Sequence, residues 1–175
     1  MQVLFVCTGN ISRSPTAERL SAAYAAVHGI PNFTASSAGT RAVIGHPVHQ
    51  YAAIALEELG GSASDFSARQ LTAKIASAAD LIVTMTRTHR DVVLETAPRQ
   101  LQRTFTFTEV SRLAAMDDAE TLFDLAGLRP RLGTTDKPDI PDPVGQSPEV
   151  FATVGAQIAS LLPPIMELCR RTIRA

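Results

Sequence analysis

Short apolar runs alternate along the chain with longer segments in which apolar residues recur at helical spacing. The runs QVLFV and DLIVTMT are nearly continuous, which is typical of strands buried on both faces of a parallel sheet. Strands are predicted over four ranges: 2–6, 33–39, 80–86 and 103–108. Helices that end at glycine or proline signals are predicted between them, over three ranges: 14–28, 47–59 and 88–96. Alternating strands and helices indicate a doubly wound α/β fold with a mostly parallel sheet.

The last third of the chain is less regular. Residues 111–137 are expected to form a long, partly flexible surface excursion with one short helical segment, ETLFDLAGL. Residues 148–173 are amphipathic but contain Pro163 and Pro164, so they predict either one kinked helix or two helices. We find no internal repeat and no low-complexity segment, and 175 residues suit a single domain over 1–175.

Composition narrows the class of protein without identifying it. A hydrophobic fraction of 45% and a charged fraction of 19% are ordinary for a globular protein, and a net charge of −1 argues against nucleic acid as a partner. No signal peptide is recognised, and no apolar stretch reaches the ~20 residues of a membrane span, so no membrane association is expected. With only two cysteines, Cys7 and Cys169, a reducing cytoplasm is the expected location.

The stretch CTGNISRS, residues 7–14, places a cysteine at the end of a predicted strand and an arginine at the start of a helix. Chemistry in doubly wound folds gathers at the carboxyl ends of the strands. Gly9 and Asn10 tolerate a left-handed backbone, which lets successive amides converge on an anion at the helix N-terminus. Arg13 adds a planar fork that matches two phosphate oxygens.

The same surroundings favour a thiolate at Cys7, with Ser14 placed to donate a hydrogen bond to the sulfur. A nucleophile, an amide cradle and a cationic clamp within eight residues are what phosphoryl transfer requires. A structural cysteine at an ordinary turn is the alternative interpretation. The Cys-x5-Arg-[Ser/Thr] spacing arises by chance at only about one cysteine in a hundred, which favours the catalytic interpretation.

Cleavage of a phosphate ester through a thiolate also needs a proton for the leaving group. The segment DIPDPVGQSPE offers Asp139 and Asp142, and prolines on both sides of Asp142 would hold its carboxyl group rigidly. We therefore favour Asp142 as general acid, and then as base for the water that hydrolyses a cysteinyl-phosphate. Four histidines show no metal-ligand spacing, and only His46 is expected near the pocket rim, as a solvated loop residue.

The residues VLFVCTGNISRSPTAE resemble the active-site loop of the low-molecular-weight protein tyrosine phosphatases, and SSAGT, ARQLT, ADLIVTMT and DIPDP follow in the family's order. The resemblance implies a four-stranded parallel sheet with helices on both faces and hydrolysis of phosphotyrosine without metal or cofactor. It also implies nucleophile, phosphate clamp and general acid roles for Cys7, Arg13 and Asp142. The loop residues expected to bind substrate with them are Thr8, Gly9, Asn10, Ile11, Ser12 and Ser14.

Several positions depart from the family pattern. Ser12 stands where many members have a second loop cysteine, so Cys7 is expected to over-oxidise more easily. Val144 follows the Asp-Pro pair where the family usually has an aromatic ring, and Val43 or Ile44 replaces the opposite ring. Aliphatic walls lose ring stacking of about 0.5–1.5 kcal/mol per pair.

Three other functions remain open at this point. A protein arginine phosphatase uses the same loop with a threonine where this chain has Ile11, so isoleucine favours the tyrosine substrate. An arsenate reductase needs relay cysteines, and only Cys169 is present outside the loop. A non-catalytic phosphate-binding module is the third. The expected partners are a phosphorylated protein substrate and a tyrosine kinase, and the chain is expected to be a monomer.

Overall fold

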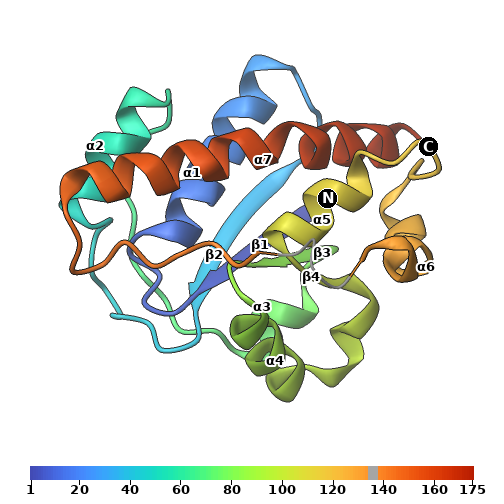
Figure 1. Ribbon diagram of the computed structural model, residues 1–175, viewed down its shortest axis with the longest axis horizontal. Coiled ribbons are helices and arrows are strands. Elements are labelled where there is room, and N and C mark those ends of the chain that lie inside the picture. Colours follow the sequence, from blue (N-terminus) through green and yellow to red (C-terminus); the bar gives the residue numbers. More distant parts are fainter. Residues whose placement is uncertain (134–137) are drawn as a thin grey trace.

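A computed structural model describes residues 1–133 and 138–175. Its centre is a four-stranded parallel sheet, with the strands in the order β2-β1-β3-β4 (Figure 1). The strands are β1 (Gln2–Cys7), β2 (Thr34–Gly39), β3 (Leu81–Thr84) and β4 (Thr104–Thr106). Because β2 and β3 lie on opposite sides of β1, the strand order reverses at β1, and the carboxyl ends of β1 and β3 form the crevice expected to hold chemistry. The doubly wound parallel prediction is confirmed.

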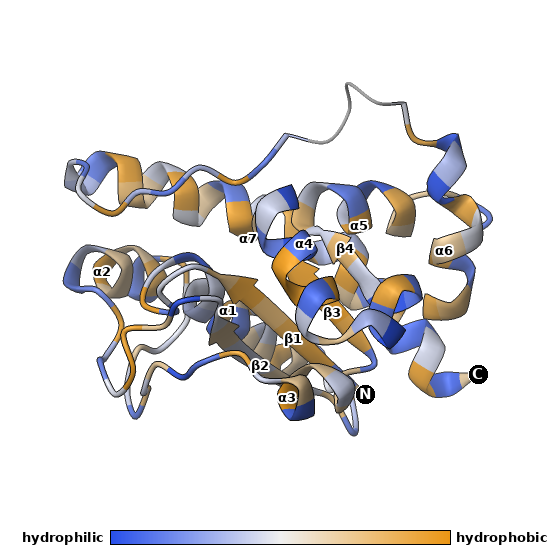
Figure 2. Ribbon diagram, turned by 90° about the horizontal axis from the view of Figure 1, so that it is seen from below, coloured by the Kyte–Doolittle hydropathy of each residue, from blue (hydrophilic) through white to orange (hydrophobic). Residues whose placement is uncertain are grey.

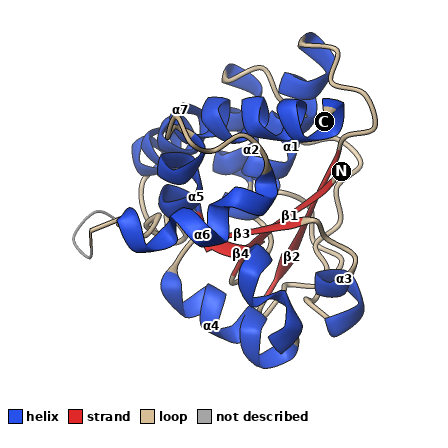
Figure 3. Cartoon of the chain, turned by 90° about the vertical axis from the view of Figure 1, so that its right-hand side faces the viewer, coloured by secondary structure: helices blue, strands red, loops and turns tan. Residues whose placement is uncertain are grey.

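Helices cover both faces of this sheet, as Figure 3 shows with the sheet seen nearly edge-on. One layer contains α1 (Arg13–Val27), α2 (Gln50–Glu58), α5 (Phe107–Ala114) and α7 (Pro148–Arg174). The other face is covered by α3 (Ala73–Ser77) and α4 (Arg87–Thr96). Sequence patterns did not predict α3, which is a single short turn capped by the Thr72 hydroxyl.

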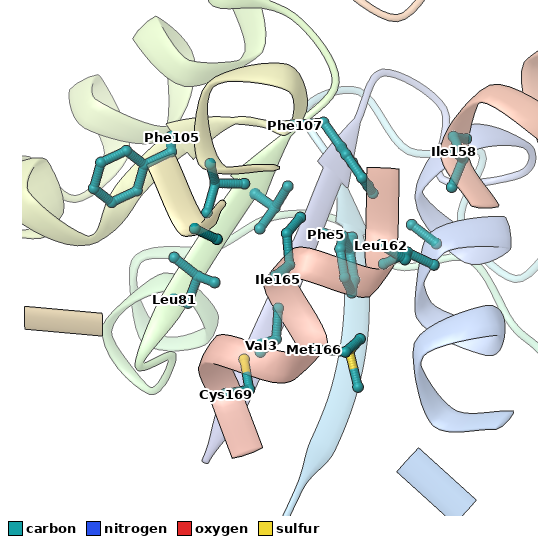
Figure 4. Close-up of a cluster of buried hydrophobic side chains, with 14 of the residues drawn as sticks. Val3, Phe5, Leu81, Phe105, Phe107, Ile158, Leu162, Ile165, Met166 and Cys169 are labelled. Carbon is teal, nitrogen blue, oxygen red and sulfur yellow. The ribbon is translucent and has the colours of Figure 1, made fainter. Parts of the chain in front are cut away.

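Alternate residues of β1 enter two separate cores, as the period of a strand requires. Val3 and Phe5 join the larger cluster with α1, α5 and α7, and Figure 4 shows Phe5 beside Phe107 and Leu162. Leu4 and Val6 face the smaller cluster under α3 and α4. The strands β1 and β3 are therefore hydrophobic along their length (Figure 2), which is why they read as continuous apolar runs.

The strand predicted over 103–108 is too long. It ends at Thr106, where a capping box starts α5: the Glu109 amide donates to the Thr106 hydroxyl, and the Glu109 carboxylate accepts from the Thr106 amide. Residues 111–114, predicted to be irregular, consequently belong to this helix. Its face against the sheet buries Val110 and Leu113.

The rest of the predicted excursion is packed more tightly than expected. A 3₁₀ turn (Leu122–Asp124), α6 (Leu125–Leu128) and a second 3₁₀ turn (Arg129–Arg131) follow one another. Leu125 is fully buried, and Arg129 forms an ion pair of 3.0 Å with Glu109 while its guanidinium lies over the Phe105 ring. Residues 134–137 of this excursion lie outside the described residues.

The terminal segment forms one continuous helix, α7, rather than two. By length and composition alone α7 is apolar enough to cross a membrane, which the sequence prediction of no such stretch overlooked. A helix in the core of a globular protein passes the same test. Here α7 packs along the sheet beside α1, α2 and α5 (Figure 1) and buries Ile158, Leu162 and Ile165 in the larger cluster. Its Phe151 lies in a third, small cluster with Val48 and Ala52.

Candidate active site

The loop between β1 and α1 is held from outside through its carbonyl groups. The segment after β2 donates backbone N–H groups to the carbonyls of four loop residues at 2.7–3.0 Å: Cys7, Thr8, Gly9 and Ile11. Within the described part of the chain, the N–H groups of residues 9–12 donate no hydrogen bond. With the carbonyls turned outward, these amides are left to bind an anion at the start of α1.

Backbone conformation explains two residue choices in and beside this loop. Asn10 has a φ of 55°, as the sequence predicted, whereas Gly9 does not have a positive φ. The expectation of a left-handed Gly9 is therefore wrong. A different glycine is required: a Cβ on Gly39 would lie 2.4 Å from the Thr8 carbonyl oxygen, so only glycine lets β2 approach the loop.

Cys7 and Ser14 are in contact at the base of the loop, with 3.0 Å between Sγ and Oγ. Both side chains are buried. The Asn10 amide donates to Ser14 Oγ at 2.9 Å, so the Ser14 hydroxyl proton is available for the sulfur. This directionality matches the role expected for Ser14, which is to stabilise a thiolate.

The hydrogen-bond chain continues to residues that sequence patterns did not single out. The same Asn10 amide donates to Ser37 Oγ at 2.8 Å, and Ser37 donates to Glu18 Oε2 at 2.5 Å. Burial raises the pKa of Glu18, an effect that the bond from Ser37 opposes. Asn10 Oδ1 also accepts from the Arg69 amide at 2.8 Å. These contacts join α1, β2 and the loop, which fixes the asparagine in its strained conformation.

Arg13 is buried at the mouth of the loop and faces the segment after residue 138. Its guanidinium donates to the Ile140 carbonyl at 3.0 Å and to Asp142 Oδ2 at 2.5 Å. Ile140 is itself anchored, because its amide donates to the Met85 carbonyl just beyond β3. The structure thus brings the predicted nucleophile, clamp and acid to one place.

The alternative acid, Asp139, is engaged elsewhere. Its Oδ1 accepts from the Arg87 amide at 2.9 Å and lies 3.7 Å from the Arg87 Nε. That pair ties the start of α4 to the proline loop. The geometry therefore favours Asp142 as the carboxyl group beside the phosphate loop.

The predicted pocket walls lie on the rim. Val43, Ile44 and Val144 are 39%, 69% and 47% exposed, which is high for aliphatic side chains. The Val43 amide bonds to the Gly9 carbonyl, and the Val144 amide donates to Asp142 Oδ1 at 3.2 Å. Ile11 and Ser12 complete the loop, half-buried and buried respectively.

A histidine that the sequence did not single out also lies at this site. His89 Nε2 is 2.8 Å from Thr8 Oγ1, and its Nδ1 is 2.9 Å from Thr86 Oγ1. Burial, together with the neighbouring Arg13 charge, lowers the pKa of His89 to about 4. Its position just after β3 was the available signal, because β3 borders the crevice beside β1. His46, expected at the rim, is exposed.

Other possible sites differ in chemistry from this one. Among residues 1–133 and 138–175, no group of three or more His, Cys, Asp or Glu side chains is placed to hold a metal ion. Cys169 is fully buried on α7, and burial raises the pKa of its thiol to about 12. A cavity of about 460 Å³ lies at the opposite edge of the sheet, near Met1 and Phe105, and contains none of the candidate residues.

Comparison with known proteins gives a consistent result. Residues 2–123 match the family model described as low molecular weight phosphotyrosine protein phosphatase. The "Probable low molecular weight protein-tyrosine-phosphatase AmsI" of Erwinia amylovora is 39% identical over 105 residues, which is 60% of this chain and 69% of the relative.

Two solved structures resemble the whole chain. The arginine phosphatase YwlE of Geobacillus stearothermophilus has a TM-score of 0.74 at 26% identity, covering 95% of this chain and 90% of its own. Wzb of Vibrio vulnificus, solved in complex with benzylphosphonate, has a TM-score of 0.72 at 27% identity and covers 95% of this chain and 97% of its own.

Proposed function

The chain belongs to the low molecular weight phosphotyrosine protein phosphatase family, and from that premise we propose that it removes phosphate from phosphotyrosine in proteins. The observation that carries the proposal is the arrangement of Cys7 on Ser14 beneath free loop amides, with Arg13 and Asp142 paired at the mouth. A thiolate nucleophile, an anion cradle and a proton donor then share one site.

In the first step, the Cys7 thiolate attacks phosphorus, forming the P–S bond as the P–O bond to the tyrosine oxygen breaks. The loop amides and the Arg13 guanidinium hold the three non-bridging oxygens, whose charge they stabilise as the transition state forms. Asp142, in its protonated form, gives its proton to the departing phenolate oxygen.

In the second step, water hydrolyses the cysteinyl-phosphate. Asp142, now a carboxylate, accepts a proton from the attacking water, and the P–S bond breaks to release inorganic phosphate. The Ser14 hydroxyl, oriented by Asn10, donates to the sulfur as negative charge returns to it.

Phosphoarginine is the competing substrate. The similarity to YwlE of Geobacillus stearothermophilus supports it, as do the aliphatic rather than aromatic walls at Val43 and Val144. Ile11 opposes it, because an aliphatic side chain adds no polar partner for the guanidinium beside the phosphate. Binding of benzylphosphonate by Wzb of Vibrio vulnificus supports an aryl ester instead.

Turnover of a phosphotyrosine peptide and a phosphoarginine peptide of matched sequence tests the proposal. We expect faster turnover of phosphotyrosine, loss of all turnover in Cys7→Ser, and trapping of a phosphocysteine in Asp142→Ala. Cys169→Ala is the matched control and should keep wild-type activity. Faster turnover of phosphoarginine would contradict the tyrosine assignment, and no turnover of either would contradict the enzyme assignment.

We extend the proposal to the cellular setting. A reducing cytoplasm is supported by two unpaired cysteines, and the lack of a nucleic-acid partner by a net charge of −1. The proposal further includes a monomer, a tyrosine kinase as the source of substrate, and no membrane partner. Cell fractionation and size-exclusion chromatography test these points. Recovery of the chain with membranes, or elution as a dimer, would contradict them.

A further inference from the structure

Three side chains connect the ends of β1 and β3 beside the nucleophile. Thr8 directly follows Cys7, Thr86 caps the N-terminus of α4, and His89 lies between their hydroxyl groups. The ring nitrogens are 2.8 Å from Thr8 Oγ1 and 2.9 Å from Thr86 Oγ1. The proposed mechanism gives none of these groups a role, although Thr8 belongs to the phosphate loop.

The cap on α4 decides where the protons lie in this chain. Thr86 Oγ1 already accepts from the His89 backbone N–H at 3.1 Å, so its single proton is best given to His89 Nδ1. A neutral ring that accepts at Nδ1 carries its proton on Nε2 and donates it to Thr8 Oγ1. With Thr8 Oγ1 accepting, its own proton is free, since the described residues offer that hydroxyl no other hydrogen bond.

The charges around His89 maintain this arrangement by keeping the ring neutral. Burial and the Arg13 guanidinium disfavour imidazolium, and Asp142 and Asp139 oppose them only in part. With the ring neutral, the hydrogen bonds run in one order: the Thr86 hydroxyl donates to Nδ1, and Nε2 donates to the Thr8 hydroxyl. The N–H of Nε2 thereby prevents the Thr8 proton from pointing back toward α4.

We propose that His89 is a positioning residue that holds the Thr8 hydroxyl as an additional hydrogen-bond donor to the bound phosphate group. Only the kinetic consequence of this inference, a change in kcat/KM, rests on the proposed phosphatase function. Phosphate binding and the position of the ring proton are separate properties of the site. The donor supplements the loop amides and Arg13 on the side of the loop nearest β3.

Nitrogen NMR of the histidine rings tests the proton position directly. In wild-type protein at neutral pH we expect His89 to carry its proton on Nε2, and the ring to remain neutral at pH 5.5. His28, which is exposed at the end of α1, is the matched reference for assigning the ring nitrogen signals. A proton on His89 Nδ1, or an imidazolium at pH 5.5, would overturn the proposal without any reference to catalysis.

Inhibition by inorganic phosphate and turnover of an aryl phosphate test the donor. Thr8→Val and His89→Phe should each weaken phosphate inhibition and lower kcat/KM by about tenfold, the effect of one hydrogen bond to a charged group. The double variant should lose no more than either single variant, because both remove the same donor. His89→Gln, whose amide can still donate to Thr8, should recover part of the loss.

Losses that multiply in the double variant, or a Thr8→Val variant with wild-type phosphate inhibition, would show that His89 only supports α4. Thermal unfolding of each variant separates the two explanations, since a purely structural histidine would lower the melting temperature and leave phosphate inhibition unchanged. If wild-type protein hydrolyses no ester, but calorimetry shows that it binds inorganic phosphate more tightly than Thr8→Val and His89→Phe do, the proposed function fails and this inference stands.

Discussion

Nη2 of Arg13 and Oδ2 of Asp142 lie 2.5 Å apart, which joins a buried cation to a carboxylate whose side chain is 46% exposed. One group comes from the first turn of α1 and the other from the proline loop before α7. A phosphate group that enters the loop competes for the same guanidinium. We expect this competition to release the carboxyl group toward the leaving oxygen, so that substrate binding prepares the acid.

Replacing Asp142 tests this relationship through the leaving group. Asp142→Ala should lower kcat/KM, which reports the step that expels the leaving group, for a phosphotyrosine peptide by about 10²-fold or more, the usual contribution of a general acid. The loss should be much smaller for p-nitrophenyl phosphate, whose leaving group needs little protonation. Steady-state kinetics with a series of aryl phosphates checks this. Equal losses for all leaving groups would assign Asp142 to binding alone.

Asp139→Ala is the matched control, three residues away on the same loop. It removes the hydrogen bond to the Arg87 amide, so we expect a loss of about 1 kcal/mol in the free energy of unfolding. The dependence of kcat/KM on the leaving group should stay as in wild type. A leaving-group dependence that follows Asp139 instead would reverse the assignment.

Ser14→Ala tests whether the Ser14 hydroxyl stabilises the Cys7 thiolate. Without the hydroxyl that contacts the sulfur at 3.0 Å, alkylation of Cys7 by iodoacetamide should slow. Turnover should fall as well, because the sulfur is both nucleophile and leaving group. Rates of alkylation across a pH series check the first effect. Identical profiles for both proteins would remove Ser14 from this role.

His89 makes folding stability depend on pH. The folded protein keeps the ring neutral down to its pKa of about 4, whereas an unfolded chain binds the proton near the ordinary value of 6.5. Acid therefore favours unfolding, and stability should fall by up to about 1.4 kcal/mol per pH unit between pH 6.5 and 4. Denaturant titrations at several pH values check this. Over this window, the free energy of unfolding should fall more steeply with acid for wild type than for His89→Gln. Parallel curves would contradict the lowered pKa.

Sequence patterns located the part of the site that is local in the chain. Cys7, Asn10, Arg13 and Ser14 fall within eight residues, so one strand-loop-helix unit contains their whole geometry. Asp142 was found because two prolines mark its loop. Even the error over 103–108 had a local cause, since the TFT alternation hides the Thr106–Glu109 capping box that starts α5.

The other site residues could not be found in this way. Ser37, Glu18 and His89 act through partners that lie 19 to 81 positions away in the chain. Their role depends on how the strands are ordered and in which register they pair, and neither property leaves a periodic signal. Gly39 is a similar case. Position 39 must be glycine only because β2 meets the Thr8 carbonyl there, and a Cβ would clash with it.

Helix α7 contains a removable source of instability. Pro163 is exposed in the helix interior and lacks the N–H that would bond the Ala159 carbonyl. Pro163→Ala should raise the free energy of unfolding by about 1–3 kcal/mol, less a small loss from the freer unfolded chain. Pro148→Ala, in the first turn of the same helix, is the matched control and should give no gain. Chemical denaturation of the two variants decides the matter, and equal effects would show that α7 tolerates its internal proline without strain.

Oxidation should inactivate the protein in a way that a thiol reductant does not reverse. A sulfenic acid on Cys7 needs a nearby thiol to stop further oxidation, and the loop offers Ser12 instead. Cys169 cannot substitute, because burial keeps its thiol protonated and it lies toward Met1 and Asp80, at the amino ends of the strands. After peroxide treatment we expect little activity to return with dithiothreitol and mass spectrometry to find sulfinic acid on Cys7. In Ser12→Cys, activity should return in large part. Full recovery of the wild-type protein would mean that the sulfenic acid is protected by a group other than a loop thiol.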